Sequence, residues 1–243
     1  MPPNNLDGKV AIVTGAGRGI GRSIARALVE SGVKTSLAAR SAHELDLVRE
    51  EIEAMGGQAA CFPTDIGSEA EAVALVHDTV DHFGRLDILI NNAGLGIFGS
   101  LVDTSTEVWD DIMRVNARGP FILCRESIPH LKEQKRSYIV NISSVVGVKG
   151  YVNQSAYAAS KHALMGMTKA LAREVRDLGI RVHAICPGGV DTQLVGNARP
   201  DLDKSVLMHP EEIADVVLFL VTRAGNAVID EIHLRRESST PWG

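Results

Sequence analysis

Short apolar runs alternate with amphipathic segments along almost the whole chain. Each run is apolar at consecutive positions, which is typical of strands that are buried on both faces of a parallel sheet. The segments between the runs repeat their apolar residues with the period of a helix. The pattern therefore predicts βαβ units and an α/β fold, in which helices cover both faces of a doubly wound, mostly parallel seven-stranded sheet.

The predicted elements follow one another without a linker, an internal repeat or a low-complexity stretch. Strands are expected at residues 9–14, 34–39, 58–62, 86–90, 137–142, 181–186 and 231–235. Helices are expected at residues 20–30, 42–55, 68–83, 107–133, 155–177 and 210–221. Residues 193–209 show no clear period and are expected to form a mobile loop over a site. Residues 1–243 are predicted to form a single domain.

Composition narrows the setting in which this domain works. Hydrophobic residues make up 45% of the chain and charged residues 23%, and the net charge of −5 comes without a cluster of Lys and Arg, so no nucleic-acid surface is expected. Three scattered cysteines fit a reducing compartment better than a disulfide framework. Residues 1–5 resemble no signal peptide, and no apolar run approaches the ~20 residues that span a bilayer. We therefore expect a cytoplasmic protein that does not bind membranes.

A glycine-rich turn follows the first predicted strand and opens the first predicted helix. Gly15, Gly19 and Gly21 give this turn the spacing G-x-x-x-G-x-G. Glycines let a backbone turn tightly against a pyrophosphate, which the N-terminus of the following helix then faces. A turn of this kind at the start of a βαβ array predicts a dinucleotide site in a Rossmann-type fold.

The end of the second predicted strand indicates which dinucleotide is bound. An NAD site usually has an acidic residue there, which binds the ribose 2′-hydroxyl. This chain has Ala38, Ala39, Arg40 and Ser41 instead. The guanidinium groups of Arg40 and Arg18 suit the geometry of a 2′-phosphate, although both could equally be solvated surface charges. The sequence predicts a preference for NADP(H) over NAD(H).

A second group of polar residues lies in the middle of the chain. Tyr157 and Lys161 are four residues apart in a predicted helix and share one face, and Ser144 lies thirteen residues before the tyrosine. A nearby ammonium group lowers the pKa of a phenol. A serine hydroxyl that faces the pair could hold a carbonyl or alcohol oxygen. The set suits proton transfer to or from oxygen, and an ordinary surface pair is the alternative.

With other motifs in the same order, these features resemble the short-chain dehydrogenase/reductase family, in its short single-domain branch. The further motifs are Asp65 after the third predicted strand, Asn91-Asn92-Ala93-Gly94 after the fourth, Asn116, Ile142-Ser143-Ser144 and Pro187-Gly188-Gly189-Val190-Asp191-Thr192. The resemblance covers nearly the whole chain. Residues 226–236 depart from it, because they lack the Gly-Gln and Asp-Gly-Gly that flank the last strand in many relatives.

The resemblance implies a role for each matching residue. Tyr157 would be the general acid or base, Lys161 would lower its pKa and bind the nicotinamide ribose, and Ser144, rather than Ser143, would orient the substrate oxygen. Asn116 would hold a water that links Lys161 to solvent. Cofactor contacts are expected for Gly15, Arg18, Gly19, Ile20, Gly21, Arg40, Asp65, Ile66, Asn91, Ala93, Gly94, Tyr157, Lys161, Pro187, Gly188, Val190 and Thr192.

Backbone chemistry adds a point at Pro120, which lies inside the predicted helix at residues 107–133. A proline donates no hydrogen bond to the carbonyl four residues earlier, which here belongs to Asn116. Because a buried carbonyl needs a partner, this oxygen is a candidate to bind the relay water. An ordinary kink, or a helix break at residues 119–120, is the alternative.

Other side chains indicate an apolar substrate pocket and a contact between subunits. Pocket residues are expected to be Leu95, Ile97, Phe98, Val145, Val146, Tyr151, Val152 and Gly189. The predicted helix at residues 155–177 is apolar on nearly every face, so this helix and the one at residues 107–133 are expected to meet a second copy in a homodimer or homotetramer. The eight histidines show no metal-ligand spacing, and no metal is expected.

The sequence therefore predicts an enzyme that transfers hydride between NADPH and a small neutral ketone or aldehyde, with Tyr157 as the proton donor. A 3-oxoacyl-thioester reductase, whose substrate is carried by an acyl carrier protein, is the alternative within the same family. A non-catalytic dinucleotide sensor is an alternative of another class. The complete set of Ser144, Tyr157 and Lys161 disfavours the sensor, because a sensor needs no proton relay.

Overall fold

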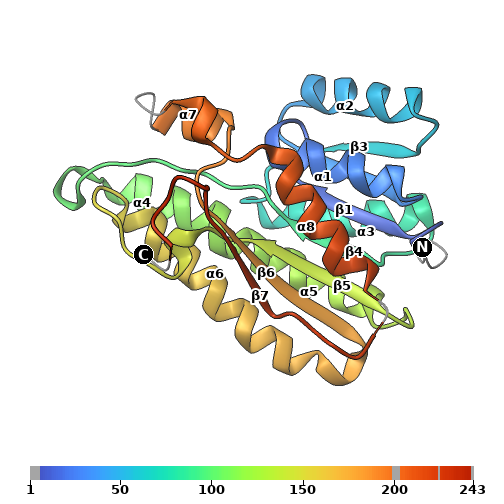
Figure 1. The fold of residues 1–243 in the computed structure, drawn as a ribbon. Coiled ribbons are helices and arrows are strands. Elements are labelled where there is room, and N and C mark those ends of the chain that lie inside the picture. Colours follow the sequence, from blue (N-terminus) through green and yellow to red (C-terminus); the bar gives the residue numbers. More distant parts are fainter. Residues whose placement is uncertain (1–5, 199–202, 224, 242–243) are drawn as a thin grey trace.

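Seven parallel strands form one sheet between two layers of helices in the computed structural model (Figure 1). The strand order is β3-β2-β1-β4-β5-β6-β7, and every neighbouring pair is parallel. The order reverses between β1 and β4, which is the topological switch point of a Rossmann-type sheet. The predicted fold class is confirmed, and the sheet is parallel throughout.

The structure describes residues 6–198, 203–223 and 225–241, so residues 1–5 and part of segment 193–209 lie outside it. Each predicted strand and helix is present, with its ends shifted by a few residues at most. The strands are β1 (Val10–Thr14), β2 (Lys34–Ala39), β3 (Ala59–Pro63), β4 (Ile88–Asn91), β5 (Ser137–Ile142), β6 (Ile180–Pro187) and β7 (Glu231–Leu234). The α-helices are α1 (Gly19–Glu30), α2 (Ala42–Ala54), α3 (Glu69–Phe83), α4 (Thr106–Met113), α5 (Gly119–Leu131), α6 (Ser155–Glu174), α7 (Gln193–Ala198) and α8 (Pro210–Thr222).

The expectation of an irregular loop at residues 193–209 is wrong for much of the described part. Helix α7 fills its start, and a 3₁₀ turn spans Lys204–Val206. Thr192 supports the first turn of α7, because its Oγ1 accepts a hydrogen bond from the Val195 amide at 3.4 Å. A helix of six residues is too short to show a period in the sequence.

The long predicted helix at residues 107–133 changes its hydrogen-bond pattern around Asn116. Residues Arg114–Arg118 form a π-helical turn between α4 and α5, and the Gly119 amide donates to the Arg114 carbonyl. Pro120 lies in the first turn of α5, where it has no amide to continue an α-helical ladder. Such π-bulges occur frequently at functional sites.

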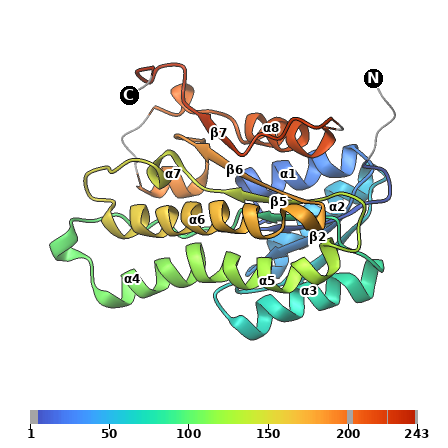
Figure 2. The same ribbon diagram turned by 90° about the horizontal axis from the view of Figure 1, so that it is seen from below.

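Two apolar cores hold the helices against the sheet (Figure 2). One core lies between the sheet and helices α1, α2 and α8, and the other lies between the sheet and helices α3, α5 and α6. Strand β1 serves both, since Ala11 and Val13 face the first core and Ile12 faces the second. Burial on both faces explains the continuously apolar runs in the sequence. Within the described residues, no helix is long and apolar enough to cross a membrane.

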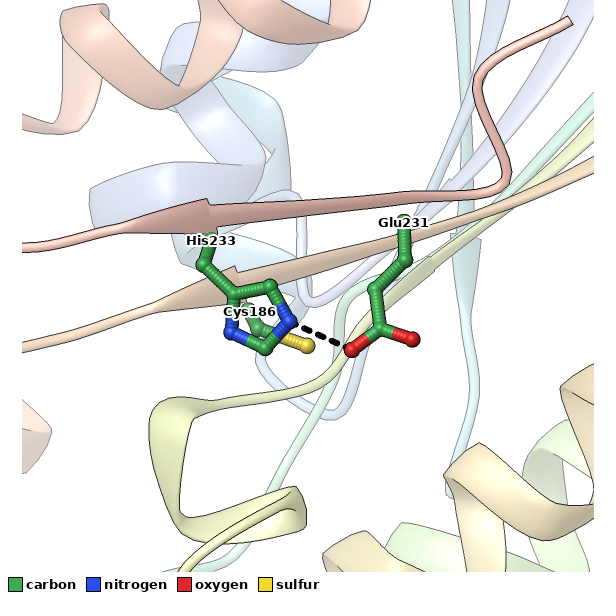
Figure 3. A group of neighbouring side chains, drawn as sticks. All are labelled: Cys186, Glu231 and His233. Carbon is green, nitrogen blue, oxygen red and sulfur yellow. Dashed lines mark hydrogen bonds and ion pairs between the residues drawn. The ribbon is translucent and has the colours of Figure 1, made fainter. Parts of the chain in front are cut away.

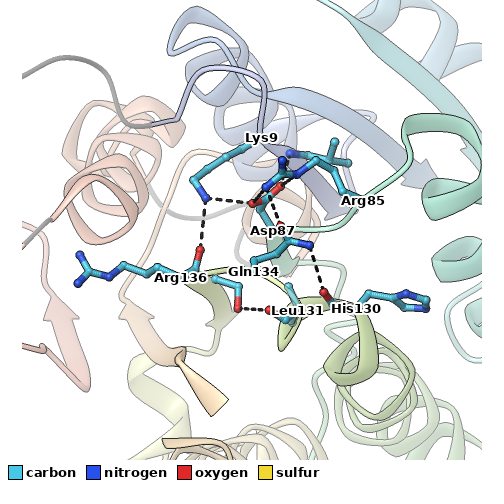
Figure 4. A network of polar contacts seen from close by, with 9 residues as sticks. Lys9, Arg85, Asp87, His130, Leu131, Gln134 and Arg136 are labelled. Atoms are coloured by element: carbon cyan, nitrogen blue, oxygen red, sulfur yellow. Dashed lines mark hydrogen bonds and ion pairs between the residues drawn. The ribbon is translucent and has the colours of Figure 1, made fainter. Parts of the chain in front are cut away.

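A buried carboxylate joins β1 to the chain that enters β4, at the amino ends of these parallel strands (Figure 4). Asp87 is fully buried, accepts from the Val10 amide at 3.0 Å, and pairs with Lys9 at 3.0 Å and Arg85 at 2.8 Å. Burial alone raises the pKa of Asp87, but the hydrogen bonds from Arg85, Val10 and Lys9 outweigh it and leave the pKa below its usual value. The charge is therefore retained inside the fold.

Replacing Asp87 with Asn is expected to lower the free energy of unfolding by about 1.5–3 kcal/mol, the contribution of hydrogen bonds to a charged group. The folded pKa of Asp87 is depressed, so this stability is present above its unfolded value of about 3.9 and is lost as the pH falls through the folded value. Urea unfolding of both proteins between pH 3 and pH 7 measures this. Asp78→Asn, at an exposed position of α3, is the control and should match the wild type at each pH.

Candidate active site

One cavity of about 1530 Å³ lies where the chain leaves the carboxyl ends of the strands. Segments that follow β1, β2, β3, β4, β5 and β6 all line it, as expected for the crevice at a switch point. Predicted site residues in the lining are Gly15, Arg18, Gly19, Ile20, Arg40, Asp65, Ile66, Ala93, Gly94, Leu95, Ile97, Ser144, Tyr157, Lys161, Pro187, Gly188, Val190 and Thr192. The fold thus brings Ser144, Tyr157, Lys161 and most of the residues expected to contact the cofactor into one space, while Gly21, Asn91 and Asn116 do not line it.

The glycine turn between β1 and α1 has room only for glycine. Gly15 and Gly19 have φ angles of 66° and 53°, in the left-handed region that favours this residue. A Cβ on Gly21 would lie 2.2 Å from the Gly15 carbonyl oxygen, so Gly21 is needed for packing although it does not line the cavity. Arg18 precedes α1 without a side-chain cap, and the first amides of the helix are left to bind an anion.

Thr14 and Asn92 join the glycine turn to the loop after β4, and the sequence analysis did not single out either side chain. Thr14 Oγ1 donates to the Ile90 carbonyl at 3.2 Å and accepts from the amides of Asn92 and Ala93 at 3.0 and 3.1 Å. Asn92 Nδ2 donates to the Thr14 carbonyl at 2.8 Å. The position of Thr14 at the end of a strand, before the glycines, was the available signal.

The side chain of Asn91, an expected cofactor contact, is directed away from the cavity. Asn91 is buried and does not line the cavity, and its Nδ2 donates to Asn141 Oδ1 on β5 at 2.8 Å. The residue lies within β4, where side chains alternate between the faces of the sheet, and its own points into the core. The neighbouring Asn92 lines the cavity instead.

Charged side chains gather at the end of β2, beside the glycine turn. Arg40 is exposed and lines the cavity, and Arg18 Nη1 lies 3.0 Å from Glu44 Oε1 on α2. Exposed ion pairs of this kind contribute little to stability, so Arg18 can turn towards another anion at small cost. The guanidinium groups of Arg18 and Arg40 therefore lie where the sequence predicts a site for a 2′-phosphate.

Asp65 closes the cavity on the side of β3. Its Oδ1 accepts from the Gly67 amide at 2.9 Å, and its Oδ2 pairs with Arg114 Nη1 at 2.9 Å. Arg114 belongs to the π-helical turn and also lines the cavity, which the sequence analysis missed. Ile66 follows with its side chain buried. The ion pair joins the β3 end of the cavity to the turn that contains Asn116.

Ser144, Tyr157 and Lys161 lie together at the other end of the cavity. All three are buried, with 9%, 8% and 4% of their surface exposed. Helix α6 places Tyr157 and Lys161 one turn apart, and Ser144 follows β5. Ser144 Oγ accepts from the Val146 amide at 3.2 Å and donates to the Pro187 carbonyl at 3.4 Å. The Phe98 ring packs edge-on against Tyr157, with ring centroids 5.3 Å apart.

The electrostatics of this group differ from the sequence expectation that Lys161 lowers the pKa of Tyr157. Burial raises the pKa of Tyr157 to about 12, and only a hydrogen bond with Ser144 acts in the opposite direction. Burial lowers the pKa of Lys161 to about 8. Lys161 Nζ donates to the Ile142 carbonyl at 3.0 Å and lies 5.9 Å from the centre of the Tyr157 ring. Loss of hydration is the main cause of both pKa shifts.

Asn116 does not line the cavity, and its side chain holds the neighbouring segments in place. Its Oδ1 accepts from the Leu95 amide at 2.7 Å, and its Nδ2 donates to the Leu95 carbonyl at 2.8 Å and to Ser160 Oγ at 3.0 Å. Ser160 lies on α6 between Tyr157 and Lys161. The side chain therefore fixes the loop after β4 against the helix that carries the catalytic candidates.

Only part of the expected substrate pocket lines the cavity. Leu95 and Ile97 do so, and Leu194 and Leu207, which the sequence analysis missed, join them. The remaining expected residues, Phe98, Val145, Val146, Tyr151, Val152 and Gly189, are not in the lining. Val146 is buried within the 3₁₀ turn that follows β5, whereas Val152, beyond that turn, is 87% exposed.

Comparison with known proteins agrees with this arrangement. The family model described as short chain dehydrogenase matches residues 9–203. A protein named uncharacterized oxidoreductase from Thermotoga maritima is 39% identical over 229 residues, which cover 88% of this chain and 90% of the relative. The 3-oxoacyl-[acyl-carrier-protein] reductase FabG of the same organism is 32% identical over 93% of this chain and 96% of its own length.

Solved structures show that the backbone fold is similar as well. A metagenomic short-chain oxidoreductase in complex with NADP is 36% identical with a TM-score of 0.85, over 96% of this chain and 99% of its own. An alcohol dehydrogenase from the archaeon Thermococcus sibiricus, complexed with 5-hydroxy-NADP, is 28% identical with a TM-score of 0.89, over 96% of this chain and 98% of its own. In sequence, fold and relatives alike, the chain belongs to the short-chain dehydrogenase/reductase family of oxidoreductases.

Proposed function

We propose that this oxidoreductase uses NADP(H) to interconvert a ketone or aldehyde and the corresponding alcohol. The observation that carries the proposal is the burial of Ser144, Tyr157 and Lys161 together at one end of a cavity that begins at a glycine turn. Binding of NADP or its derivative by two similar structures supports the choice of cofactor.

The residues present fit a dinucleotide. The cradle at Gly15 and Gly21, which a Cβ would fill, and the uncapped start of α1 suit a pyrophosphate. Arg18 and Arg40 suit a 2′-phosphate, and Asp65 with Ile66 lines the adenine side. Pro187, Gly188, Val190 and Thr192 line the opposite end, beside Ser144. The bound cofactor supplies or accepts the hydride, and the protein provides orientation and the proton.

The raised pKa of Tyr157 and the lowered pKa of Lys161 support Tyr157 as the proton donor of a reduction. With a pKa of about 12, the Tyr157 hydroxyl keeps its proton at neutral pH and can donate it to a carbonyl oxygen held by Ser144. With a pKa of about 8, Lys161 is mostly cationic at pH 7 and stabilises the phenolate that proton transfer leaves. Because the Asn116 side chain is bound to Leu95 and Ser160, its backbone carbonyl is the group we assign to a relay water.

The cavity wall supports a neutral, largely apolar substrate. Leu95, Ile97, Leu194 and Leu207 line it, so the reacting carbonyl meets apolar groups on several sides. A 3-oxoacyl thioester is the second candidate, and the FabG relative of Thermotoga maritima supports it. Turnover of acetoacetyl thioester beside simple ketones and aldehydes distinguishes the two substrate classes.

Replacing Tyr157 with Phe is expected to lower kcat for NADPH-dependent reduction about 10²–10⁴-fold, the usual effect of losing a general acid. NADPH binding, followed by its fluorescence, should stay close to that of the wild type. Tyr138→Phe is the matched control, because that tyrosine is buried in the core away from the cavity. Full turnover by Tyr157→Phe would contradict the assigned role.

Replacing Arg40 with Ala is expected to raise the KM for NADPH about 10- to 100-fold, since a hydrogen bond to a charged group contributes about 1.5–3 kcal/mol. The KM for NADH should not change, because NADH has no 2′-phosphate. Arg49→Ala on α2, which pairs with Glu53 outside the cavity, is the matched control. Equal kinetic efficiency of the wild type with the two cofactors would refute the NADP(H) assignment.

We also propose that the protein forms a homodimer or homotetramer through α5 and α6. Small residues Ala163, Gly166 and Ala170 are exposed along α6, and the Phe121 ring of α5 is 49% exposed. A side chain at Gly166 meets nothing in the chain itself, so Gly166→Arg should keep the fold but give a monomeric mass. Light scattering at micromolar concentration measures this. Ala54→Arg, exposed on α2, is the control, and a monomeric wild type would refute the proposal.

A further inference from the structure

Cys186, Glu231 and His233 gather at the edge of the sheet formed by β6 and β7 (Figure 3). The register pairs Cys186 with His233 and Ala184 with Glu231, so the three side chains share one face of the sheet. Their sulfur, oxygen and nitrogen atoms all lie within 4.8 Å of one another. None of the three lines the cavity of the candidate active site. The cluster is therefore a separate feature of the fold.

Helix α6 covers this cluster from one side. Met165 Sδ lies 3.7 Å from Cys186 Sγ, and Lys169 Nζ lies 3.6 Å from Glu231 Oε2. His233 Nε2 and Glu231 Oε1 are hydrogen-bonded at 2.5 Å. Cys186 is fully buried, whereas the imidazole of His233 is 48% exposed. The cluster thus has a buried thiol at its base and a rim that solvent can reach.

A buried hydroxyl beside the thiol gives a second, independent observation. Ser143 is 4% exposed, and its Oγ has no hydrogen-bond partner of good geometry. The hydroxyl lies next to Cys186, whose pKa is raised to about 11 by burial and by the Glu231 carboxylate, while the contact with Ser143 acts in the opposite direction. A buried donor without a partner is uncommon and asks for an explanation. A cation bound to Cys186 would displace the thiol proton and leave the sulfur to accept the bond that Ser143 lacks.

We propose that Cys186, Glu231 and His233 form a zinc site. Thiolate, imidazole and carboxylate are the protein ligands of Zn²⁺, and three of them with one open position is a common arrangement. Mg²⁺ and Ca²⁺ require oxygen ligands and are excluded by the cysteine. The ion takes the place between His233 and Glu231 that their hydrogen bond now closes, and water completes its coordination. This site is independent of the proposed reaction and stands whether or not the protein reduces carbonyls.

The ion would join the last two strands beneath the candidate active site. Cys186 is followed by Pro187, whose carbonyl accepts the bond from Ser144 Oγ at 3.4 Å. His233 is followed by Leu234, whose carbonyl accepts from the Gly188 amide at 2.8 Å. Cys186 therefore precedes a residue that lines the cavity, and His233 precedes a residue that is bonded to one. Zinc bound only to the native state would also stabilise it, in proportion to its concentration.

Zinc binding to the full chain tests the proposal. The protein is freed of metal with a chelator, and Zn²⁺ is titrated in competition with a chromophoric chelator. We expect one ion per chain in the wild type. Cys186→Ser and His233→Ala should each weaken binding at least tenfold, since losing even an outer-shell partner costs about 10–100-fold. Co²⁺ in place of Zn²⁺ should give a thiolate charge-transfer band that Cys186→Ser abolishes.

Control variants keep the test decisive. Cys61→Ser and His43→Ala remove a partly exposed thiol and an exposed imidazole elsewhere, and should leave binding unchanged. Lys169→Met removes the cation that competes for Glu231 and should tighten binding several-fold, a gain that a purely structural cluster would not give. If Cys186→Ser fails to fold, Glu231→Gln and Lys169→Met carry the test. Binding that is absent from the wild type, or equal in the wild type and the cluster variants, would overturn the proposal.

Discussion

The hydroxyl of Thr14 is the contact on which the geometry of the site depends. It bonds β1 to the chain that leaves β4, at the point where the strand order of the sheet reverses. The loops that leave β1 and β4 diverge there, and a bond from Asn92 Nδ2 to the Thr14 carbonyl adds to the contact. With Thr14 in place, the glycine turn and the loop through Asn92 are held at one separation. The cavity between them is therefore preformed.

The far end of the cavity is governed by desolvation. Tyr157 and Lys161 are both buried, and no carboxylate contributes to the pKa shift of either. Burial raises the pKa of Tyr157 and lowers that of Lys161, so it favours the neutral form of each group. Because the Lys161 amine is held by the Ile142 carbonyl, its position does not depend on the tyrosine. A buried cation near a protonated phenol suits a site that gives up a proton and then stabilises the resulting anion.

The amino ends of the strands carry buried ion pairs that stabilise the fold, and the carboxyl ends carry the candidate active site. Asp87, Lys9 and Arg85 satisfy one another at one end, so their charges contribute to folding. At the other end, the glycine turn, Arg40 and Ser144 line the cavity, where they can contact a ligand. Parallel strands make this separation possible, since all their carboxyl ends lie at the same edge.

Local pattern was sufficient for the elements and for much of the site. Continuous apolar runs determined the strands, because burial on both faces leaves no alternation, and the spacing of Tyr157 and Lys161 determined a shared helix face. Local pattern failed where a residue's direction depends on its neighbours in space. Asn91 points into the core, although the next residue, Asn92, lines the cavity. Val152 points to solvent, although it lies shortly before the helix that carries Tyr157 and Lys161.

The sequence by itself thus determined the α/β fold, since strands and helices follow from the periods of neighbouring residues. It indicated the glycine turn and the set of Ser144, Tyr157 and Lys161 through their spacing and a family resemblance, and the roles of these residues stay predictions. Only the tertiary structure decided the pKa values, which arise from burial, and the roles of Thr14 and Asn116, which arise from contacts between distant segments. The register of β6 and β7 likewise decided that Cys186 meets His233. The spacing of Cys186 and His233 along the chain does not predict their contact, because it forms only when β6 and β7 pair.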